Sequence, residues 1–133
     1  FVEAFRKEFG VDYEEAVKIV SGDLGGRDEE KVKQIIVDCS GDLSLGIERS
    51  ISFLKTAGDA ETIDRIVLSG GGARIPFLPE IIAEKHGILP SIHNPLDGIE
   101  FDESVLHSLD EDLDGIAPLL TVGIGLALRK VGK

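Results

Sequence analysis

The sequence predicts an α/β fold, in which a helical region precedes a short parallel strand–helix–strand unit. Residues 63–92 give the clearest sign, because the apolar stretches Ile63–Leu68 and Leu89–Ile92 flank a glycine-rich turn and an amphipathic stretch. Strands joined by a helix at this spacing pair in parallel. Residues 1–62 repeat apolar positions every three or four residues, and a final apolar stretch follows near the end. We expect two subdomains, helical at 1–62 and βαβ with a buried last helix at 63–133.

The first two helices are predicted from periodicity and capping residues. Apolar side chains three and four residues apart indicate a helix over Phe1–Phe9, and Gly10 suits the position that ends it. Asp12 is a typical N-cap for a second helix reaching Val20, and Glu15 three residues later completes a capping box.

A long third helix is predicted from Asp28 to Ala57. Its apolar residues form one stripe, at Val32, Ile36, Cys39, Leu43, Ile47, Ile51 and Leu54. Gly41 and Gly46 weaken the helix by about 1 kcal/mol each relative to Ala. A kink or break at Ser40–Asp42 is therefore an open alternative.

The βαβ unit is predicted to contain a helix over Ile75–His86, closed by Gly87. The last helix is predicted to carry Pro118 in its first turn and to reach Val131. It is apolar on nearly every side, so we expect it to be buried against the sheet, with Gly123 and Gly125 allowing a close approach.

Composition limits the possible functions. The 133 residues carry 25 acids against 14 bases, a net charge of -11, which argues against binding to nucleic acid or to an anionic membrane. The lone Cys39 forms no disulfide within the chain and no cysteine metal cluster. No stretch reaches the roughly 20 apolar residues of a membrane span. Because the chain begins with Phe1 and contains no Met, we expect it to be part of a longer protein.

The turn Gly70–Gly72 is the main candidate site. Glycine backbone adopts positive φ and approaches a ligand closely, and the planar guanidinium of Arg74 can stack on a base. The alternative is a tight strand-to-helix turn beside an exposed arginine. The turn is neither a Walker A loop nor a G-x-G-x-x-G motif, because no Gly-Lys-Ser/Thr follows and Ile75 occupies the last glycine position.

The wider segment Ser69–Pro76 resembles the adenosine motif of the superfamily of actin, heat-shock chaperones and sugar kinases. Segments around it occur in an order that resembles the second half of the PilM family, actin-like cytoplasmic proteins of type IV pilus assembly related to the division protein FtsA. These segments are Phe9–Ala16, Ile47–Phe53, His93–Ile99 and Val122–Arg129. The resemblance covers essentially the whole chain.

This resemblance implies an actin-like, ribonuclease H-like fold, of which the chain would supply part of the second lobe. Gly70, Gly71, Gly72 and Arg74 would then face the adenosine of ATP. On the long helix, related proteins often carry Glu-x-x-Arg or Glu-x-x-Lys facing the ribose. Arg49 matches the basic position, whereas Gly46 stands at the glutamate position, so Arg49 is either a nucleotide ligand or a surface residue.

The resemblance also implies an incomplete site. The Asp-Gly hairpins that hold phosphate and Mg²⁺ in this superfamily find no match here, so we assign no catalytic residue and expect no ATP hydrolysis by this chain alone. The whole protein would be an ATP-binding scaffold, cytoplasmic and held at the inner membrane by partners such as a PilN-type tail, which binds mainly the other lobe. Self-association of this chain is a further expectation.

Two other functions remain open. The chain could belong to another actin-like protein, such as an FtsA-like division protein or a small-molecule kinase, or to an unrelated interaction module with purely structural glycines. A calcium loop is not favoured: Asp110, Asp112 and Asp114 match the first half of an EF-hand, but Thr121 replaces the final glutamate and Pro118 falls inside the loop. We therefore expect no metal site.

Overall fold

The computed structural model describes residues 1–58, 62–100 and 113–129. It divides into two compact units. Unit 1 comprises Phe1–Ile66 and Ile75–Ser91, and unit 2 comprises Val67–Arg74 and Ile92–Lys133. The units group residues by contact, and the division of the sequence into subdomains at residues 62 and 63 stays a prediction.

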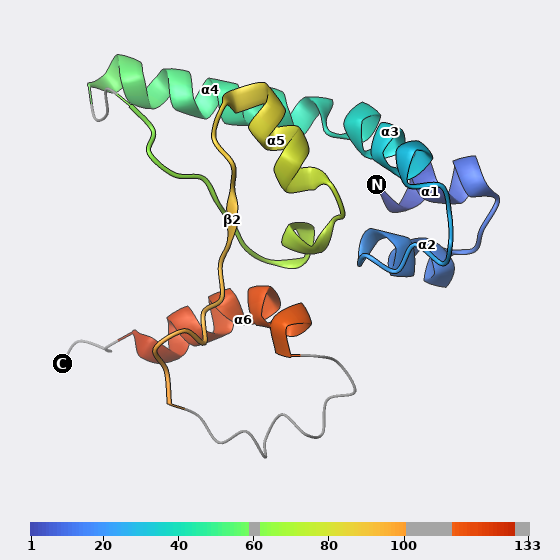
Figure 1. Cartoon of the computed structure of the whole chain (residues 1–133). Helices are drawn as coiled ribbons and strands as arrows, with labels where there is room; N and C mark the ends of the chain where they lie inside the picture. The colour runs from blue at the N-terminus through green and yellow to red at the C-terminus, as the bar shows by residue number, and fades with distance from the viewer. Residues whose placement is uncertain (59–61, 101–112, 130–133) are drawn as a thin grey trace. The chain divides into compact units, whose positions relative to one another are not determined.

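Unit 1 is built from helices (Figure 1). They are α1 (Val2–Phe9), α2 (Tyr13–Val20), α3 (Glu29–Cys39), α4 (Gly41–Ala57) and α5 (Leu78–His86). The predicted end of α1 and the Asp12 cap are confirmed: Gly10 ends α1 at φ 66°, and the Asp12 carboxylate accepts the N–H of Glu15 at 2.9 Å. The Glu15 side chain pairs with Arg27 instead of completing the predicted capping box. Asp28 likewise accepts the N–H groups of Glu30 and Lys31. Side-chain oxygens thus satisfy N–H groups that lack a partner within the helix.

The predicted long helix is two helices, because the helical conformation is interrupted at Ser40. Ser40 is 1% exposed, and its hydroxyl donates to the carbonyl of Val37 at 2.9 Å. A serine that bonds its own helix backbone, followed by Gly41, favours a helix end over continuation. The alternative left open for Ser40–Asp42 is therefore the correct one.

The core of unit 1 is formed by side chains from four of these helices. Its fully buried members are Phe5, Ala16, Ile19, Val32, Ile36, Ile81 and Ile82. The predicted apolar stripe is buried along α3 but not along α4, where Leu43 and Leu54 are 41% and 37% exposed. A single stripe over both helices was therefore wrong, since the break at Ser40 ends the common helical register.

The strands β1 (Val67–Leu68) and β2 (Ser91–Ile92) form a short parallel pair. The N–H of Ser91 donates to the carbonyl of Ile66 at 3.0 Å, and the N–H of His93 donates to that of Leu68 at 2.8 Å. Both sets of residue numbers rise together along this ladder, which makes the strands parallel. The predicted strand–helix–strand order is confirmed, with shorter strands than expected.

The helix between the two strands, α5, begins later than predicted, at Leu78 instead of Ile75. A short 3₁₀ helix, η1 (Gly71–Arg74), occupies the turn first. Pro76 restricts the residue before it to extended backbone, and Phe77 has φ 60°, a left-handed conformation that no α-helix continues through.

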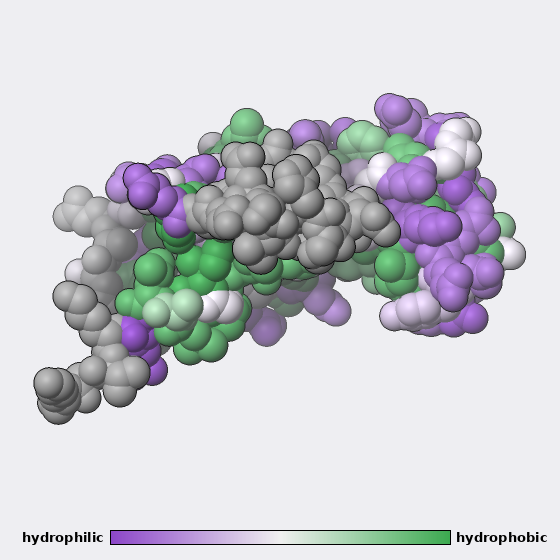
Figure 2. All heavy atoms as spheres, turned by 90° about the horizontal axis from the view of Figure 1, so that it is seen from below, coloured by the Kyte–Doolittle hydropathy of each residue, from purple (hydrophilic) through white to green (hydrophobic). Residues whose placement is uncertain are grey.

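The last helix, α6 (Leu113–Leu128), also differs from the prediction. It begins before Pro118, which lies inside it. Ile116, Ala117 and Pro118 are buried, as expected, but Val122, Leu126 and Leu128 are 72%, 63% and 66% exposed. Figure 2, which views the molecule from below Figure 1, shows a broad apolar surface on this face. Burial along the whole helix was thus wrong for the described residues. Apart from the backbone of α6 and the chain neighbours of each glycine, no described atom lies within 4 Å of a Cβ built on Gly123 or Gly125.

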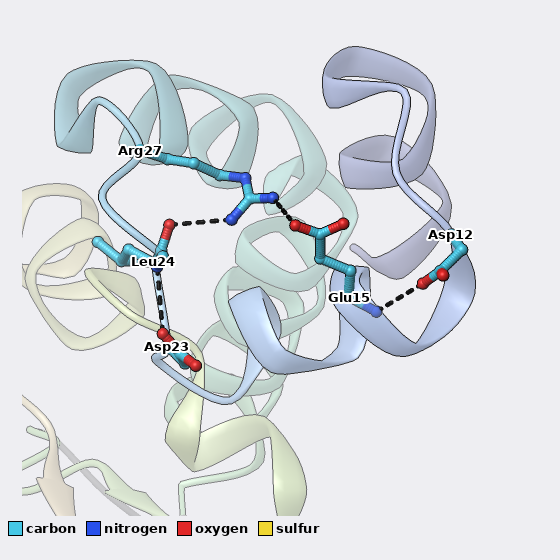
Figure 3. A network of polar contacts seen from close by, with 6 residues as sticks. Asp12, Glu15, Asp23, Leu24 and Arg27 are labelled. Atoms are coloured by element: carbon cyan, nitrogen blue, oxygen red, sulfur yellow. Dashed lines mark hydrogen bonds and ion pairs between the residues drawn. The ribbon is translucent and has the colours of Figure 1, made fainter.

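An arginine holds the loop between α2 and α3 (Figure 3). Arg27 pairs through Nη2 with the carboxylate of Glu15 and donates from Nη1 to the carbonyl of Leu24 at 3.1 Å. Its guanidinium carbon also lies 5.6 Å from the centre of the Phe9 ring. The side chain of Glu15 therefore pairs with Arg27, while the backbone N–H of Glu15 donates to the capping carboxylate of Asp12.

Arg27→Ala is expected to lower the free energy of unfolding by about 1–3 kcal/mol, because it removes a half-buried ion pair, a loop hydrogen bond and ring packing together. Arg6→Ala is the matched control: its pair with Glu3 is exposed, so we expect a change within about 0.5 kcal/mol. Chemical denaturation of the full-length variants checks this. Equal effects of the two substitutions would contradict the account.

Candidate functional site

The glycine turn of unit 2 follows β1 and is shaped by Gly70. Gly70 has φ 76°, which side-chain-bearing residues rarely adopt. Its N–H donates to the carbonyl of Pro118 in α6 at 2.8 Å, and its carbonyl accepts the N–H of Ala73 at 3.1 Å. The turn is therefore fixed at its first residue, through both the N–H and the carbonyl of Gly70.

The next two glycines are exposed and begin η1. The first N–H groups of a helix have no partner inside it, so these backbones present donors at the surface of the turn. A Cβ built on Gly71 would lie 3.6 Å from the Leu119 side chain, whereas one on Gly72 would meet nothing within 4 Å. Gly72 therefore leaves the most room for a ligand to approach.

Arg74 closes η1 and is half-buried. A Cβ built on Gly115 of α6 would lie 3.7 Å from Nη2 of Arg74, so the guanidinium lies along the backbone of that helix. The neighbouring Ala73 and Ala117 are 3% and 1% exposed. The turn thus combines glycine backbone with a flat cation, both placed against α6.

One expected component is absent from the turn. A helix that starts at the glycines would bring its positive end to them, but α5 begins at Leu78 and belongs to unit 1. The element that begins at the glycines, η1, has 4 residues, too few to sum the peptide dipoles of a real helix end. The chemistry of the turn therefore suits a flat base better than a phosphate.

Arg49 belongs to the other unit. It lies on α4 and is exposed. One turn earlier, the carbonyl of Gly46 accepts a hydrogen bond from the hydroxyl of Ser50 at 2.9 Å. Unit 1 thus contains Arg49, and unit 2 contains Gly70, Gly71, Gly72 and Arg74. The assignment of Arg49 to a ribose stays a prediction.

The sequence analysis did not predict that two further residues of unit 2 contact this turn. Pro118 and Gly115 contact it from α6: Pro118 lies 48 residues after Gly70, and Gly115 lies 41 residues after Arg74. A proline inside an otherwise apolar helix was the available signal, but the helix start was placed at that proline instead. The residues after β2 are held by a local hydrogen bond. The side-chain oxygen of Asn94 accepts the N–H of Leu96 at 3.0 Å, beside the buried Pro95.

A separate hollow of about 370 Å³ lies in unit 1. Its lining is Asp12, Glu14, Glu15, Lys18, Asp23, Gly25 and Arg27. Most of its polar groups serve the fold: Asp12 caps α2, Asp23 accepts the N–H of Gly25 at 3.1 Å, and Glu15 pairs with Arg27. This hollow is therefore explained by the loop that surrounds it.

Within the described ranges, no group of three or more His, Cys, Asp or Glu side chains is arranged to hold a metal ion. The calcium-like pattern at Asp110–Asp114 lies outside the residues whose side chains are described. Nor is any helix in the described part of the chain long and apolar enough to cross a membrane.

Gly70→Ala is expected to lower the free energy of unfolding by about 1–2 kcal/mol, because a Cβ at φ 76° is strained. Gly72→Ala is the matched control, since its φ is not positive and a Cβ there meets open space. We expect that variant to change stability by less than about 0.5 kcal/mol. Denaturation of both full-length variants gives the comparison. A tolerated Gly70→Ala would contradict the described turn.

Comparison with known families gives one match over nearly the whole chain. The sequence model of the family described as "Type IV pilus assembly protein PilM" matches residues 1–131. It spans both units, including the glycine turn, Arg49 and α6. The resemblance inferred from the separate sequence segments is thereby confirmed. The chain belongs to the PilM family of type IV pilus assembly proteins.

Proposed function

We propose that this chain contributes the adenosine side of an ATP site in a scaffold protein of type IV pilus assembly. The observation that carries this proposal is the fixed glycine turn beside Arg74. Gly72 leaves open space, Gly71 and Gly72 are exposed, and the guanidinium of Arg74, which ends the turn, lies beside the backbone of α6 at Gly115. A purine can pack on glycine backbone without meeting a side chain, and a guanidinium stacks on its flat face.

The same turn lacks the features of a phosphate site. Phosphates favour successive backbone N–H groups at the start of a real helix, or a lysine held near them. Here the N–H of Gly70 is used by Pro118, and η1 has 4 residues. We therefore assign the base and sugar to this chain, and the phosphates with Mg²⁺ to residues outside it.

An ATP-binding scaffold also accounts for the residue types that the site lacks. Phosphoryl transfer needs a phosphate cradle, metal carboxylates and a positioned water. We assign no catalytic residue here, and binding of ATP would serve assembly with pilus platform proteins, such as a PilN-type cytoplasmic tail. Under this proposal the protein is cytoplasmic and reaches the inner membrane through those partners.

A purely structural turn is the second candidate. It is favoured by the same bond that fixes the turn, because Gly70 needs positive φ to reach Pro118 whether or not a ligand binds. The two functions differ at Arg74, whose exchange should affect nucleotide affinity only if the turn faces a ligand.

Arg74→Ala in the full-length protein is expected to weaken ATP binding about tenfold, the equivalent of about 1.4 kcal/mol of lost stacking. Arg65→Ala is the control, an exposed arginine just before β1. Fluorescent-nucleotide titration gives both affinities, and the thermal melting temperature reports folding. Equal affinities for ATP in the two variants would favour the structural turn.

The isolated chain is expected to bind ATP and ADP weakly, with a Kd well above the micromolar range, and not to hydrolyse ATP. Half of an adenosine site leaves the phosphates in water, so little of the ligand surface is buried. Isothermal calorimetry and a phosphate-release assay on residues 1–133 measure both properties. Micromolar binding, or turnover above a blank without protein, would show that the site is more complete than proposed.

A further inference from the structure

We propose that Pro118 of α6 is a positioning residue of the nucleotide site, and that its carbonyl sets the conformation of the glycine turn. This inference rests on the proposed function. The primary observation is the hydrogen bond of 2.8 Å from the N–H of Gly70 to that carbonyl. It joins two segments of unit 2 that are far apart in sequence.

Pro118 marks a place where α6 lacks a regular helix hydrogen bond. Pro118 has no N–H, so the carbonyl of residue 114 loses its usual donor, and a proline inside a helix kinks or breaks it. The carbonyl of Pro118 itself accepts the hydroxyl of Thr121 at 2.9 Å as well as the N–H of Gly70. A carbonyl oxygen has two lone pairs, so it can accept both donors.

Packing supports the same contact. Ala73 of η1 and Ala117 of α6 are almost fully buried, and Ile116 is 8% exposed. Small side chains on both elements let the backbones approach closely. The Leu119 side chain lies 3.6 Å from where a Cβ of Gly71 would be, so α6 also limits the space beside the second glycine.

Two consequences follow for the site. Gly70 is a shape-determining residue instead of a ligand donor, because its N–H is already used. Binding at the turn then depends on α6, whose outer residues Val122 and Leu126 are exposed. A change in the bend of α6 would alter the turn, and through it the affinity for adenosine.

Hydrogen exchange of ¹⁵N-labelled glycine in the full-length protein tests this proposal. We expect the Gly70 amide to be protected. Pro118→Ala keeps the acceptor carbonyl but restores an N–H to bond the carbonyl of residue 114, which straightens the helix around the acceptor. We expect this change of direction to break the contact and to speed exchange about tenfold, the equivalent of one lost hydrogen bond. The amides of Gly10 and Gly87, which donate to Arg6 and Ala83, serve as internal controls. Their exchange should stay unchanged, which separates a local effect from unfolding.

Matched variants sharpen the result. Pro79→Ala replaces a proline in the first turn of α5 and should leave the Gly70 amide unchanged. Thr121→Val should partly reduce Gly70 protection, while Thr121→Ser, which keeps the hydroxyl, should restore it. Thr121→Val also keeps the test available if Pro118→Ala does not fold.

ATP affinity of the same variants completes the test. A fall in affinity that follows the loss of Gly70 protection, with Gly10 and Gly87 unchanged, supports the positioning role. Fast Gly70 exchange in the wild type, or lost protection with unchanged affinity, would overturn it. Absence of ATP binding to the wild type would overturn the proposed function instead, and the exchange rates would still decide whether Pro118 fixes the turn.

Discussion

Unit 2 depends on one backbone contact, the hydrogen bond from Gly70 to Pro118. Only a residue at positive φ brings the turn into this position, and glycine adopts that conformation without strain. The acceptor is the carbonyl of Pro118 inside α6, which also accepts the hydroxyl of Thr121. This bond therefore joins the turn that follows β1 to the buried residues Ile116–Pro118 of α6.

Unit 1 combines a core of buried apolar side chains with helix caps and charged contacts. Asp12 and Asp28 begin helices, and Arg27 links its loop to α1 and α2 through Glu15 and the Phe9 ring. The chain is nevertheless strongly acidic, with a net charge of -11. A nucleotide is anionic as well, so the proposed function, which assigns the base and not the phosphates to this chain, carries a lower electrostatic cost of binding.

Much of the fold was predictable because its signals are local. Caps at Asp12 and Asp28, the end of α1 at Gly10 and the strand–helix–strand order follow from side chains within four residues of each position. Two boundaries differ from the prediction: α5 is delayed by the left-handed Phe77 just before it, and α6 extends back past Pro118. The sequence pointed to Gly70–Gly72 and Arg74 but not to their partner on α6, because that contact joins residues far apart along the chain. Burial of α6 was overestimated because apolar residues on every side do not say which side is covered.

The central claim is that the glycine turn of this PilM-family chain faces adenosine. The most direct measurement is a titration of ATP into full-length protein labelled with ¹⁵N-glycine and ¹⁵N-arginine, since the 16 glycines of this chain report from both units. The account predicts that the largest amide shift changes fall on Gly71, Gly72 and Arg74, with Gly25 in the unit 1 hollow unchanged. Largest changes at Gly25 and Arg27, with a silent glycine turn, would contradict it.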